Sequence, residues 1–293
     1  MKVSVLLPIY NRAHTLPRCL ASIRAQTFAD WELIAVDDGS SDGSADLIAG
    51  DPRFRLLRHE VNRGAAAARN TALAAAEGEF VALIDSDDEW LPQKLERQLA
   101  CLQERGADGC GCEYWAVDGA SEQRISLPAP ASWAEELHVR CGLGNGTTLL
   151  ARRECLRAIG PLDERLRIYE DWDWMLRFAI RFRYTVLEEP LARVHFSGPR
   201  DPVTFANSAE RFLENHAAEF QRLGSAHAAT VRSLHYEYVA ANALAQRRFA
   251  LGCAYVWKSV AAAPLRRPLI LGALPVAGID ALLGTSLLAR VMK

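Results

Sequence analysis

The sequence predicts an α/β protein with a mostly parallel central sheet, followed by a helical C-terminal region. Over the first hundred residues, apolar strand patterns alternate with helical patterns, as repeated β-α-β units do. From about residue 200 the chain becomes rich in alanine and in helical patterns. We therefore expect two domains, residues 1–200 and 201–293. In such sheets ligands bind at the carboxyl ends of the strands, which is where candidate site residues should lie.

Composition disfavours several other classes. The chain has 293 residues, enough for one large α/β domain with an appendage. Its formal net charge of −2 gives no reason to expect nucleic-acid binding. Seven cysteines lie at irregular positions, and the pair Cys110 and Cys112 has no partner pair at zinc spacing. We expect reduced, cytosolic thiols, and a first strand in place of a signal peptide.

The first strand is expected at residues 3–9, where a continuous aliphatic run suits a strand covered on both faces. A helix should follow at 16–26, because Leu16, Leu20 and Ile23 fall on one helical face.

The next elements repeat this alternation. We expect buried strands at 31–38, 54–60 and 79–85, and a helix of high propensity at 63–76. Residues 39–44 read GSSDGS, a turn that can cap the helix that follows it.

Beyond this region the pattern changes. Pro92 should lie just inside the next helix, a strand is expected at 108–119, and a Pro-rich loop at 126–133. Residues 142–160 predict a Gly-rich turn, a short strand and a helix, and 169–182 an amphipathic helix. The glycines of the turn lack the GxGxxG spacing and a clear preceding strand, which disfavours a Rossmann cofactor site.

Polar and acidic residues follow four successive expected strands. Because parallel strands end at one edge of a sheet, these residues should converge. Loop solvation or helix capping would explain any one pair, but four clusters at four strand ends are harder to explain that way. The clusters are Pro8-Ile9-Tyr10-Asn11, Asp37-Asp38, Asn62-Arg63-Gly64, and Asp85 with Asp87 and Asp88.

The pair Asp85-x-Asp87 can hold one hard divalent cation between oxygen ligands. So few protein ligands would leave phosphate oxygens to complete the site, which suits Mg²⁺ or Mn²⁺ with a nucleotide diphosphate. The metal would neutralise charge that builds on a departing phosphate. Taken alone, this pattern is weak, and a solvated acidic loop is the alternative.

The context of this pair is more specific. Residues 1–195 contain VSVLLPIYNR, WELIAVDDGSSDGS, NRGAAAARNTALAAAEGEFVALIDSDDEWLPQKL, GNGTTLLARRECLRAIGPLDERL and YEDWDWMLR, in that order. In these motifs the chain resembles the family 2 glycosyltransferases of the GT-A fold. The resemblance implies a Rossmann-like nucleotide-binding sheet and an inverting transfer of a sugar from a nucleotide-diphosphate donor, most often UDP, to an acceptor hydroxyl.

The resemblance also implies roles for the strand-end residues. Pro8 and Tyr10 would frame the base, with the Tyr10 ring stacked on it, while Asp38 would hydrogen-bond the base and Asp37 would support the turn and ribose side. The implied nucleotide-binding residues are Pro8, Tyr10, Asn11, Asp37, Asp38, Asn62, Gly64, Arg69, Asp85 and Ser86.

For the chemistry, the resemblance implies that Asp87 is the direct metal ligand, with Asp85 on the ribose or on metal-bound waters. Asp171 would be the catalytic base that takes the proton of the acceptor hydroxyl. Acidic residues also favour a helix N-terminus electrostatically, which is the alternative reading of this segment. Tyr169 stands where many relatives carry glycine. The donor-sugar and acceptor pocket would contain Gly144, Asn145, Gly146, Glu170 and Trp172.

The expected product is a cell-surface glycan, built on a saccharide or lipid-linked saccharide acceptor by single additions, because the QxxRW motif of processive synthases is absent between 196 and 230. Two alternatives stay open. A nucleotidyltransferase would normally show a Gly-rich, basic loop after the first strand, where this chain reads PIYNRAHTLP. A non-catalytic module that binds glycans or nucleotide sugars would not need the complete aspartate set.

Residues 203–263 predict several helices, in which His216, His227 and His235 lack metal-ligand spacing and should be surface or packing residues. The apolar stretch 268–289 is long enough to span a bilayer, although Asp280 in its centre opposes insertion. A packed hairpin and an interfacial anchor are the alternatives, and flanking Arg and Lys residues favour an anionic membrane surface. We expect a cytoplasmic protein, for which peripheral attachment to the inner face of the cytoplasmic membrane is one of these alternatives.

Overall fold

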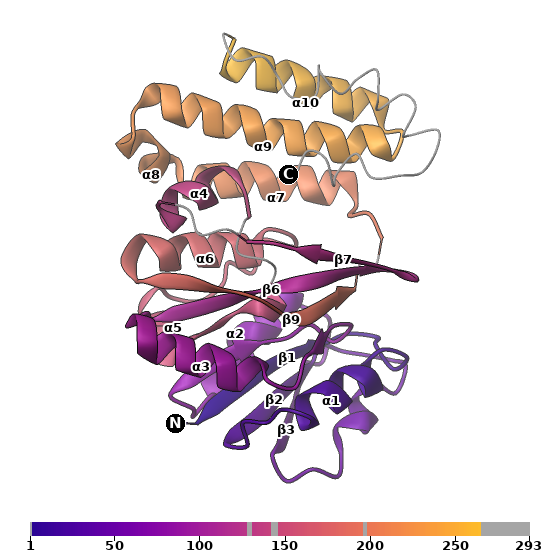
Figure 1. Cartoon of the computed structure of the whole chain (residues 1–293). Helices are drawn as coiled ribbons and strands as arrows, with labels where there is room; N and C mark the ends of the chain where they lie inside the picture. Colours follow the sequence, from indigo (N-terminus) through magenta and orange to yellow (C-terminus); the bar gives the residue numbers. More distant parts are fainter. Residues whose placement is uncertain (1, 128–130, 142–145, 196–197, 265–293) are drawn as a thin grey trace. The chain divides into compact units, whose positions relative to one another are not determined.

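The computed structural model describes residues 2–127, 131–141, 146–195 and 198–264 (Figure 1). Their contacts define two compact units. The sheet unit comprises Met1–Leu137, Cys141–Glu164 and Glu170–Ser197. The helical unit comprises His138–Arg140, Arg165–Tyr169 and the chain from Gly198 onward, so two short segments of the N-terminal part belong to it.

The first half of the sheet is parallel, as the alternating pattern predicts. Its strands run in the order β3-β2-β1-β4, and β1 lies between β2 and β4 with Leu6 opposite both Ile34 and Leu83. The strands are β1 (Val3–Ile9), β2 (Trp31–Asp37), β3 (Phe54–Arg58) and β4 (Phe80–Leu83). The intervening helices are α1 (Leu16–Arg24), η1 (Ser44–Ile48), α2 (Ala65–Ala75) and α3 (Lys94–Arg105).

The second half of the sheet is mixed. β8 lies antiparallel between β4 and β6, and β9 runs parallel to β6. The strands are β5 (Glu89–Trp90), β6 (Gly109–Asp118), β7 (Ser121–Ile125), β8 (Leu150–Arg152) and β9 (Tyr184–His195). The helices of this half are α4 (Trp133–Val139), η2 (Gly146–Thr148), α5 (Arg153–Ala158) and α6 (Glu170–Arg181).

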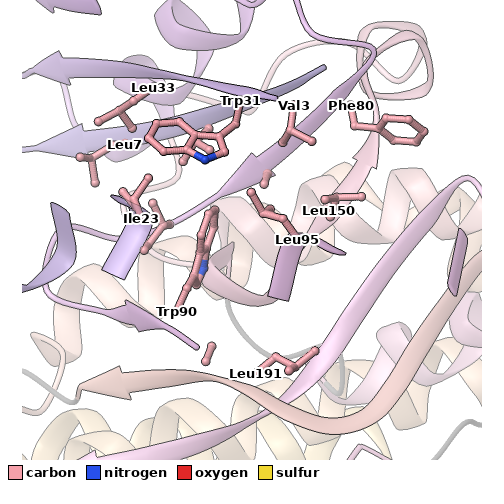
Figure 2. Packing of buried hydrophobic residues seen from close by; sticks show 14 of the residues in the cluster. Val3, Leu7, Ile23, Trp31, Leu33, Phe80, Trp90, Leu95, Leu150 and Leu191 are labelled. Atoms are coloured by element: carbon pink, nitrogen blue, oxygen red, sulfur yellow. The ribbon is translucent and has the colours of Figure 1, made fainter. Parts of the chain in front are cut away.

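The main core of the sheet unit joins both halves. Figure 2 shows side chains from the strands clustered with Ile23 of α1 and Leu95 of α3. Trp31 and Trp90 are 3% and 2% exposed. Burial of each large apolar side chain contributes roughly 1.5–3 kcal/mol, so this cluster fixes the strand ends that carry the polar residues.

Three details correct the sequence expectations. Pro92 precedes α3, which begins at Lys94 with Gln93 as its N-cap, because the short strand β5 occupies the preceding residues. The hairpin strand β7 was not predicted, since its SEQRI sequence is almost fully exposed and has no apolar alternation. β9 was also missed, because Pro190 interrupts its pattern at a register shift, the kind of place where a strand accepts proline.

The helical unit contains α7 (Pro202–Asn215), α8 (Ala217–Arg222), α9 (Ser225–Ala245) and α10 (Phe249–Ala262). The Asp201 carboxylate accepts a hydrogen bond from the Thr204 N–H at 2.8 Å, and Pro202 opens α7, which is a favourable helix start. No helix within the described ranges is both long and apolar enough to cross a bilayer. The stretch 268–289 lies outside these ranges.

Candidate active site

The candidate site begins where β1 and β2 end. Here the loop after β1 is bonded to the loop after β2: the Asn11 and Arg12 N–H groups donate to the hydroxyls of Ser40 and Ser44 at 3.0 and 2.7 Å. The Asn11 side chain in turn accepts from the Ser41 N–H at 2.9 Å. Tyr10 is 46% exposed, so this residue is accessible at this edge of the sheet.

Asp38 holds the turn that follows β3. Its carboxylate accepts hydrogen bonds from the N–H groups of Arg63 and Gly64, the latter at 2.7 Å, and contacts His59 Nδ1 at 2.6 Å. Gly64 has φ +98, a conformation that glycine adopts without strain. Asp38 is only 2% exposed, so a bond to a nucleotide base would share oxygens that already bind the turn.

Two further residues stabilise this edge. Asp37 accepts from the Ser40 N–H at 3.1 Å and so shapes the turn after β2. His59, which the sequence expectations did not include, also contacts the Thr71 hydroxyl at 2.9 Å through Nε2. Asp37 and Asp38 therefore stabilise the loops of the candidate site. Both are buried, whereas Tyr10 is exposed.

Arg69 lies at the centre of the second half of the site. Its guanidinium donates to Asp85 Oδ1 at 2.5 Å and to Glu170 Oε1 at 2.8 Å, and the residue is 3% exposed. Its Nε has no hydrogen-bond partner among the described residues. Arg69 thus joins the loop after β4 to the start of α6, whereas the resemblance implied only that it is a nucleotide-binding residue.

Glu170 has an unusual environment. Burial, and then the Asp171 carboxylate beside it, raise the pKa of Glu170 to about 7, although Arg69 acts in the opposite direction. The pKa of Glu170 is therefore close to neutral pH, and such shifted pKa values are frequent at functional sites.

Asp171 lies in the first turn of α6. Its Oδ2 accepts from the Gly146 N–H at 3.3 Å, and its Oδ1 accepts from the Trp172 N–H at 2.8 Å. Gly146 also approaches Arg69, since a Cβ at this position would lie 3.3 Å from Nη2. The structure therefore brings together Arg69, Asp85, Gly146, Glu170 and Asp171.

The remaining pocket residues are placed differently. Trp172 is 7% exposed, and its indole N–H donates to the Leu137 carbonyl at 2.7 Å, so its side chain is buried and bonded to α4. Gly144 and Asn145 lie outside the described residues.

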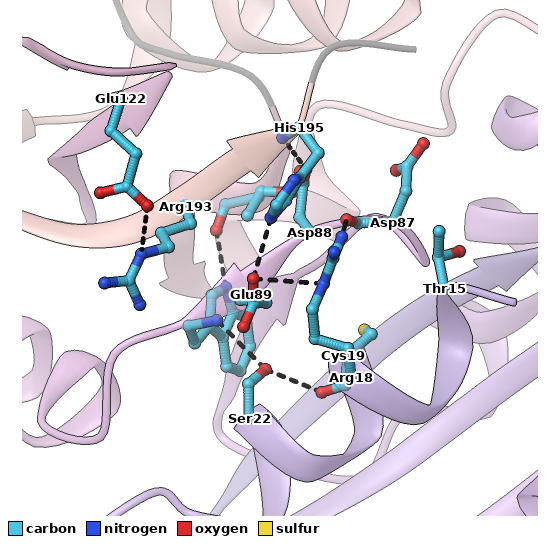
Figure 3. A network of polar contacts seen from close by, with 12 residues as sticks. Thr15, Arg18, Cys19, Ser22, Asp87, Asp88, Glu89, Glu122, Arg193 and His195 are labelled. Atoms are coloured by element: carbon cyan, nitrogen blue, oxygen red, sulfur yellow. Dashed lines mark hydrogen bonds and ion pairs between the residues drawn. The ribbon is translucent and has the colours of Figure 1, made fainter. Parts of the chain in front are cut away.

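The acidic loop after β4 is held from several sides (Figure 3). Asp88 is 1% exposed and accepts hydrogen bonds from the Thr147 hydroxyl and from the His195 N–H, while burial raises its pKa well above the usual value. Thr147 also accepts from the Asp85 N–H at 3.1 Å. Thr147 was missed, although it lies within the quoted motif GNGTT.

Asp87 faces the start of the first helix. Its Oδ2 lies 3.5 Å from Arg12 Nη2, and its carbonyl accepts from Arg18 at 2.7 Å. Ser86 is buried, and its carbonyl accepts from the Thr15 hydroxyl at 3.0 Å, so this residue shapes the loop through its backbone. Arg12 and Arg18 were not among the predicted site residues.

The donor set at this loop fits a hard divalent cation that completes its shell elsewhere. The side chains of Asp85 and Asp87 are 32% and 19% exposed. Within the described part of the chain, no group of three or more His, Cys, Asp or Glu side chains is arranged to hold a metal by itself. Two accessible carboxylates would need oxygens from a ligand or from water, as Mg²⁺ sites with bound phosphates do.

Comparison with known proteins found similar sequences and structures. The family model described as Glycosyl transferase family 2 matches residues 4–144. The chain is 36% identical to WfgD of Escherichia coli, a UDP-Glc:alpha-D-GlcNAc-diphosphoundecaprenol beta-1,3-glucosyltransferase, over 51% of this chain and 60% of that protein. It is 31% identical to the uncharacterized glycosyltransferase alr2836 of Nostoc sp., over 71% of this chain and 69% of that protein.

Among solved structures, TarS of S. aureus (residues 1–349) in complex with UDP-GlcNAc superposes with a TM-score of 0.72 and 20% sequence identity. The match covers 96% of this chain and 89% of that one, and it shows the shared GT-A fold.

Proposed function

Since this chain belongs to glycosyl transferase family 2, we propose that it transfers a sugar, with inversion, from a nucleotide-diphosphate donor to a hydroxyl of a saccharide or lipid-linked saccharide in cell-surface glycan synthesis. The observation that carries the proposal is the bridge from Asp85 through Arg69 to Glu170, beside Asp171. It supports a site in which Asp85 lies on the phosphate side of the donor and Asp171 is the base.

The donor nucleotide binds, in this proposal, at the edge formed by the loops after β1, β2 and β3. The exposed Tyr10 ring stacks on the base, and Pro8 and Asn11 set the loop that carries this ring. Asp37 and Asp38 support the neighbouring turns, including Asn62 and Gly64. A UDP-sugar is the proposed donor, supported by the UDP-GlcNAc bound to the structurally similar TarS and by the UDP-Glc specificity in the name of WfgD.

Asp87, assisted by Asp85, would hold Mn²⁺ or Mg²⁺ against the donor diphosphate. When bound, the metal would stabilise the charge on the departing nucleotide. Asp85 interacts with Arg69 and Asp87 with Arg12, and the resemblance favours Asp87 as the direct metal ligand.

Asp171 is the proposed general base. It is partly exposed, and the contact of its Oδ2 with the Gly146 N–H is long, at 3.3 Å, so this oxygen can accept the proton of an acceptor hydroxyl. The hydroxyl oxygen then attacks the anomeric carbon from the face opposite the leaving diphosphate, which produces inversion. Gly146 and Glu170 border the reacting groups, and Trp172 supports the wall behind them.

The acceptor side fits a membrane surface in the same proposal. Phe249 and Trp257 of α10 are 63% and 74% exposed, and Arg247, Arg248 and Lys258 lie beside them in the sequence. Exposed aromatic and basic groups favour the interface of an anionic membrane. Sedimentation with anionic vesicles tests this part, and a chain that stays in the supernatant at low salt contradicts it.

Calorimetric titration tests the donor half. The full chain would be titrated with UDP, GDP, dTDP and ADP, each with Mn²⁺ and with EDTA. Metal-dependent binding of one nucleotide is expected, and it selects the sugars for a transfer assay that detects the released nucleotide. Absence of binding under all conditions would overturn the donor assignment, whereas binding without turnover across the sugar and acceptor set would favour a glycan-binding module.

A further inference from the structure

The acidic loop, residues 85–88 between β4 and β5, is held along its backbone by the start of α1 (Figure 3). The carbonyl of Ser86 accepts a hydrogen bond from the Thr15 hydroxyl at 3.0 Å, and the carbonyl of Asp87 accepts from the Arg18 guanidinium at 2.7 Å. These contacts fix the middle of the loop and use no side-chain atom of the loop itself.

A single hydroxyl from a distant segment binds both ends of the same loop. Thr147 Oγ1 accepts from the Asp85 N–H at 3.1 Å, and its own proton is donated to the Asp88 carboxylate. The other oxygen of Asp88 accepts from the His195 N–H at 2.8 Å. Thr147 is 0% exposed, so water cannot replace this hydroxyl, and its loss would leave buried polar groups without a partner.

The turn that carries this hydroxyl is itself fixed by buried side chains. The carbonyl of Thr147 accepts from the Trp90 indole N–H at 2.9 Å, and the carbonyl of Thr148 accepts from the Gln98 side chain at 2.8 Å. Gln98 is bonded in turn by Lys94 Nζ at 2.7 Å. Trp90, Lys94 and Gln98 are all buried, so the position of the hydroxyl is set by the core of the sheet unit.

The same turn also contacts the proposed base. The N–H of Gly146 lies 3.3 Å from Asp171 Oδ2, and Thr147 is the next residue along η2. Consecutive residues of one turn therefore contact the start of α6 and the acidic loop. All of these segments belong to the sheet unit, so the arrangement rests on contacts within a single compact body.

We propose that Thr147 is a positioning residue whose hydroxyl fixes the ends of the acidic loop and so directs the Asp85 and Asp87 carboxylates toward the donor diphosphate and its metal. The inference rests on the proposed function, because it assigns a consequence to the proposed roles of these two carboxylates. Thr147 itself touches neither donor nor metal in this scheme. Loss of a group that supports a metal ligand lowers metal affinity or activity by about 10-fold to 100-fold.

Thr147→Val tests the hydroxyl, because valine has a similar shape but neither donates nor accepts. We expect its affinity for UDP in Mn²⁺ to fall by about 10-fold to 100-fold. Its affinity in EDTA should not change, because the loops after β1, β2 and β3 form the proposed base edge. Calorimetry of the full chain measures both values. A loss of the same size in Mn²⁺ and in EDTA would overturn the proposal.

Two further variants at this position keep the test independent of folding. Thr147→Ser retains the hydroxyl and should bind UDP in Mn²⁺ with the wild-type affinity, and a loss as large as that of Thr147→Val contradicts the role of the hydroxyl. Should Thr147→Val fail to fold, Thr147→Cys takes its place, because a thiol is only a weak donor and acceptor. The same selective loss of affinity in Mn²⁺ is expected for it.

Ser4→Ala is the matched control. The Ser4 hydroxyl is also 0% exposed, donates to the Glu32 carboxylate at 2.7 Å and accepts from the Gly78 N–H at 2.8 Å. It makes the same kinds of bond as Thr147, but near the start of β1, away from the end of that strand which carries the site. Ser4→Ala should lower Tm and leave the affinity for UDP in Mn²⁺ unchanged. Equal losses of affinity in Ser4→Ala and Thr147→Val would show a general effect of lost stability.

Amide hydrogen exchange of the full chain without ligand provides a readout besides binding and turnover. Thr147→Val should accelerate exchange in the peptide that contains Asp85, because the N–H of Asp85 loses its acceptor, and Ser4→Ala should not. Unchanged exchange in Thr147→Val overturns the positioning role whatever the activity of the chain. A wild-type chain that binds none of the nucleotides, together with accelerated exchange in Thr147→Val, contradicts the proposed function alone.

Discussion

The Arg69 guanidinium donates to the Glu170 carboxylate at 2.8 Å, across 101 positions of sequence. The same guanidinium binds Asp85, so one buried cation joins the end of β4 to the start of α6. Asp171 follows Glu170 directly, which makes this bridge the structural link between the proposed donor side and the proposed base.

Removal of this cation should destabilise the protein and abolish transfer. Arg69→Ala leaves the Asp85 and Glu170 carboxylates without their buried partner, and breaking such a pair costs about 3–5 kcal/mol. Urea unfolding measures the loss. Arg97→Ala is the control, because Arg97 and Glu189 form an exposed ion pair that water screens, so its removal should change stability little. Equal losses in the two variants would contradict the central role of Arg69.

Substitution of the proposed metal ligand should remove the metal dependence of donor binding. Asp87→Asn loses one charge at a partly exposed position, so the fold should be retained. Loss of a residue that only supports a metal ligand lowers metal affinity by about 10-fold to 100-fold. Loss of a direct ligand should therefore lower the Mn²⁺-dependent affinity for UDP by at least about tenfold. Calorimetry with and without EDTA provides the measurement, and Asp118→Asn at the exposed end of β6 is the surface control. Unchanged affinity would remove Asp87 from the metal site.

Substitution of the proposed base should separate binding from chemistry. Asp171→Asn keeps the shape and the contact with the Gly146 N–H but cannot accept the acceptor proton. We expect transfer to fall by about 10²–10⁴-fold, the usual contribution of a general base, with nucleotide Kd unchanged. Single-turnover assays and calorimetry check the two halves. Retained turnover in the Asn variant would show that another group is the base.

Acid should destabilise the protein through its buried histidines. Burial lowers the pKa of both His138 and His235 to about 4, whereas the unfolded chain titrates near 6.5. The unfolded chain therefore binds more protons between these values, so this stability is fully present above pH 6.5 and is lost as the pH falls toward 4. The shifted pKa of His235 can therefore lower the free energy of unfolding by at most about 3 kcal/mol at acid pH.

Urea unfolding at several pH values between 7.5 and 4 tests this behaviour. The groups that face these two rings include His216, His227 and Glu219, and His227 contributes to the lowered pKa of His138. His235→Phe should flatten the pH dependence over this range, and His14→Gln, at an exposed position, should not. Identical pH profiles for wild type and His235→Phe would contradict the prediction.

The histidines also show what spacing alone can predict. His216 and His235 were expected to be surface or packing residues, and both are buried in the helical unit. Their lack of metal-ligand spacing excluded one role. Their contacts with Tyr169 and Phe212 could not be predicted, because helices that are rich in alanine give a weak pattern for which faces meet.

The sequence by itself determined the parallel half of the sheet and the edge that carries the site. Continuous apolar runs specify buried strands, and the alternation with helices makes them parallel, so residues that follow Ile9, Asp37 and Leu83 must gather at one edge. The resemblance added roles that spacing could not supply. Many relatives carry glycine at the position of Tyr169, and the positive φ of Tyr169 is a conformation that glycine adopts without strain.

Only the tertiary structure decided which partners the charged side chains at that edge have and which of them are exposed. Asp38 and Asp88 have similar sequence settings to Asp87, yet Asp38 binds a turn, Asp88 is buried against Thr147, and Asp87 is partly exposed. The sequence orders residues along a chain, whereas the ionisation and availability of a carboxylate depend on burial and on partners from distant segments, such as Arg69 for Glu170. Those contacts exist only once the chain is folded.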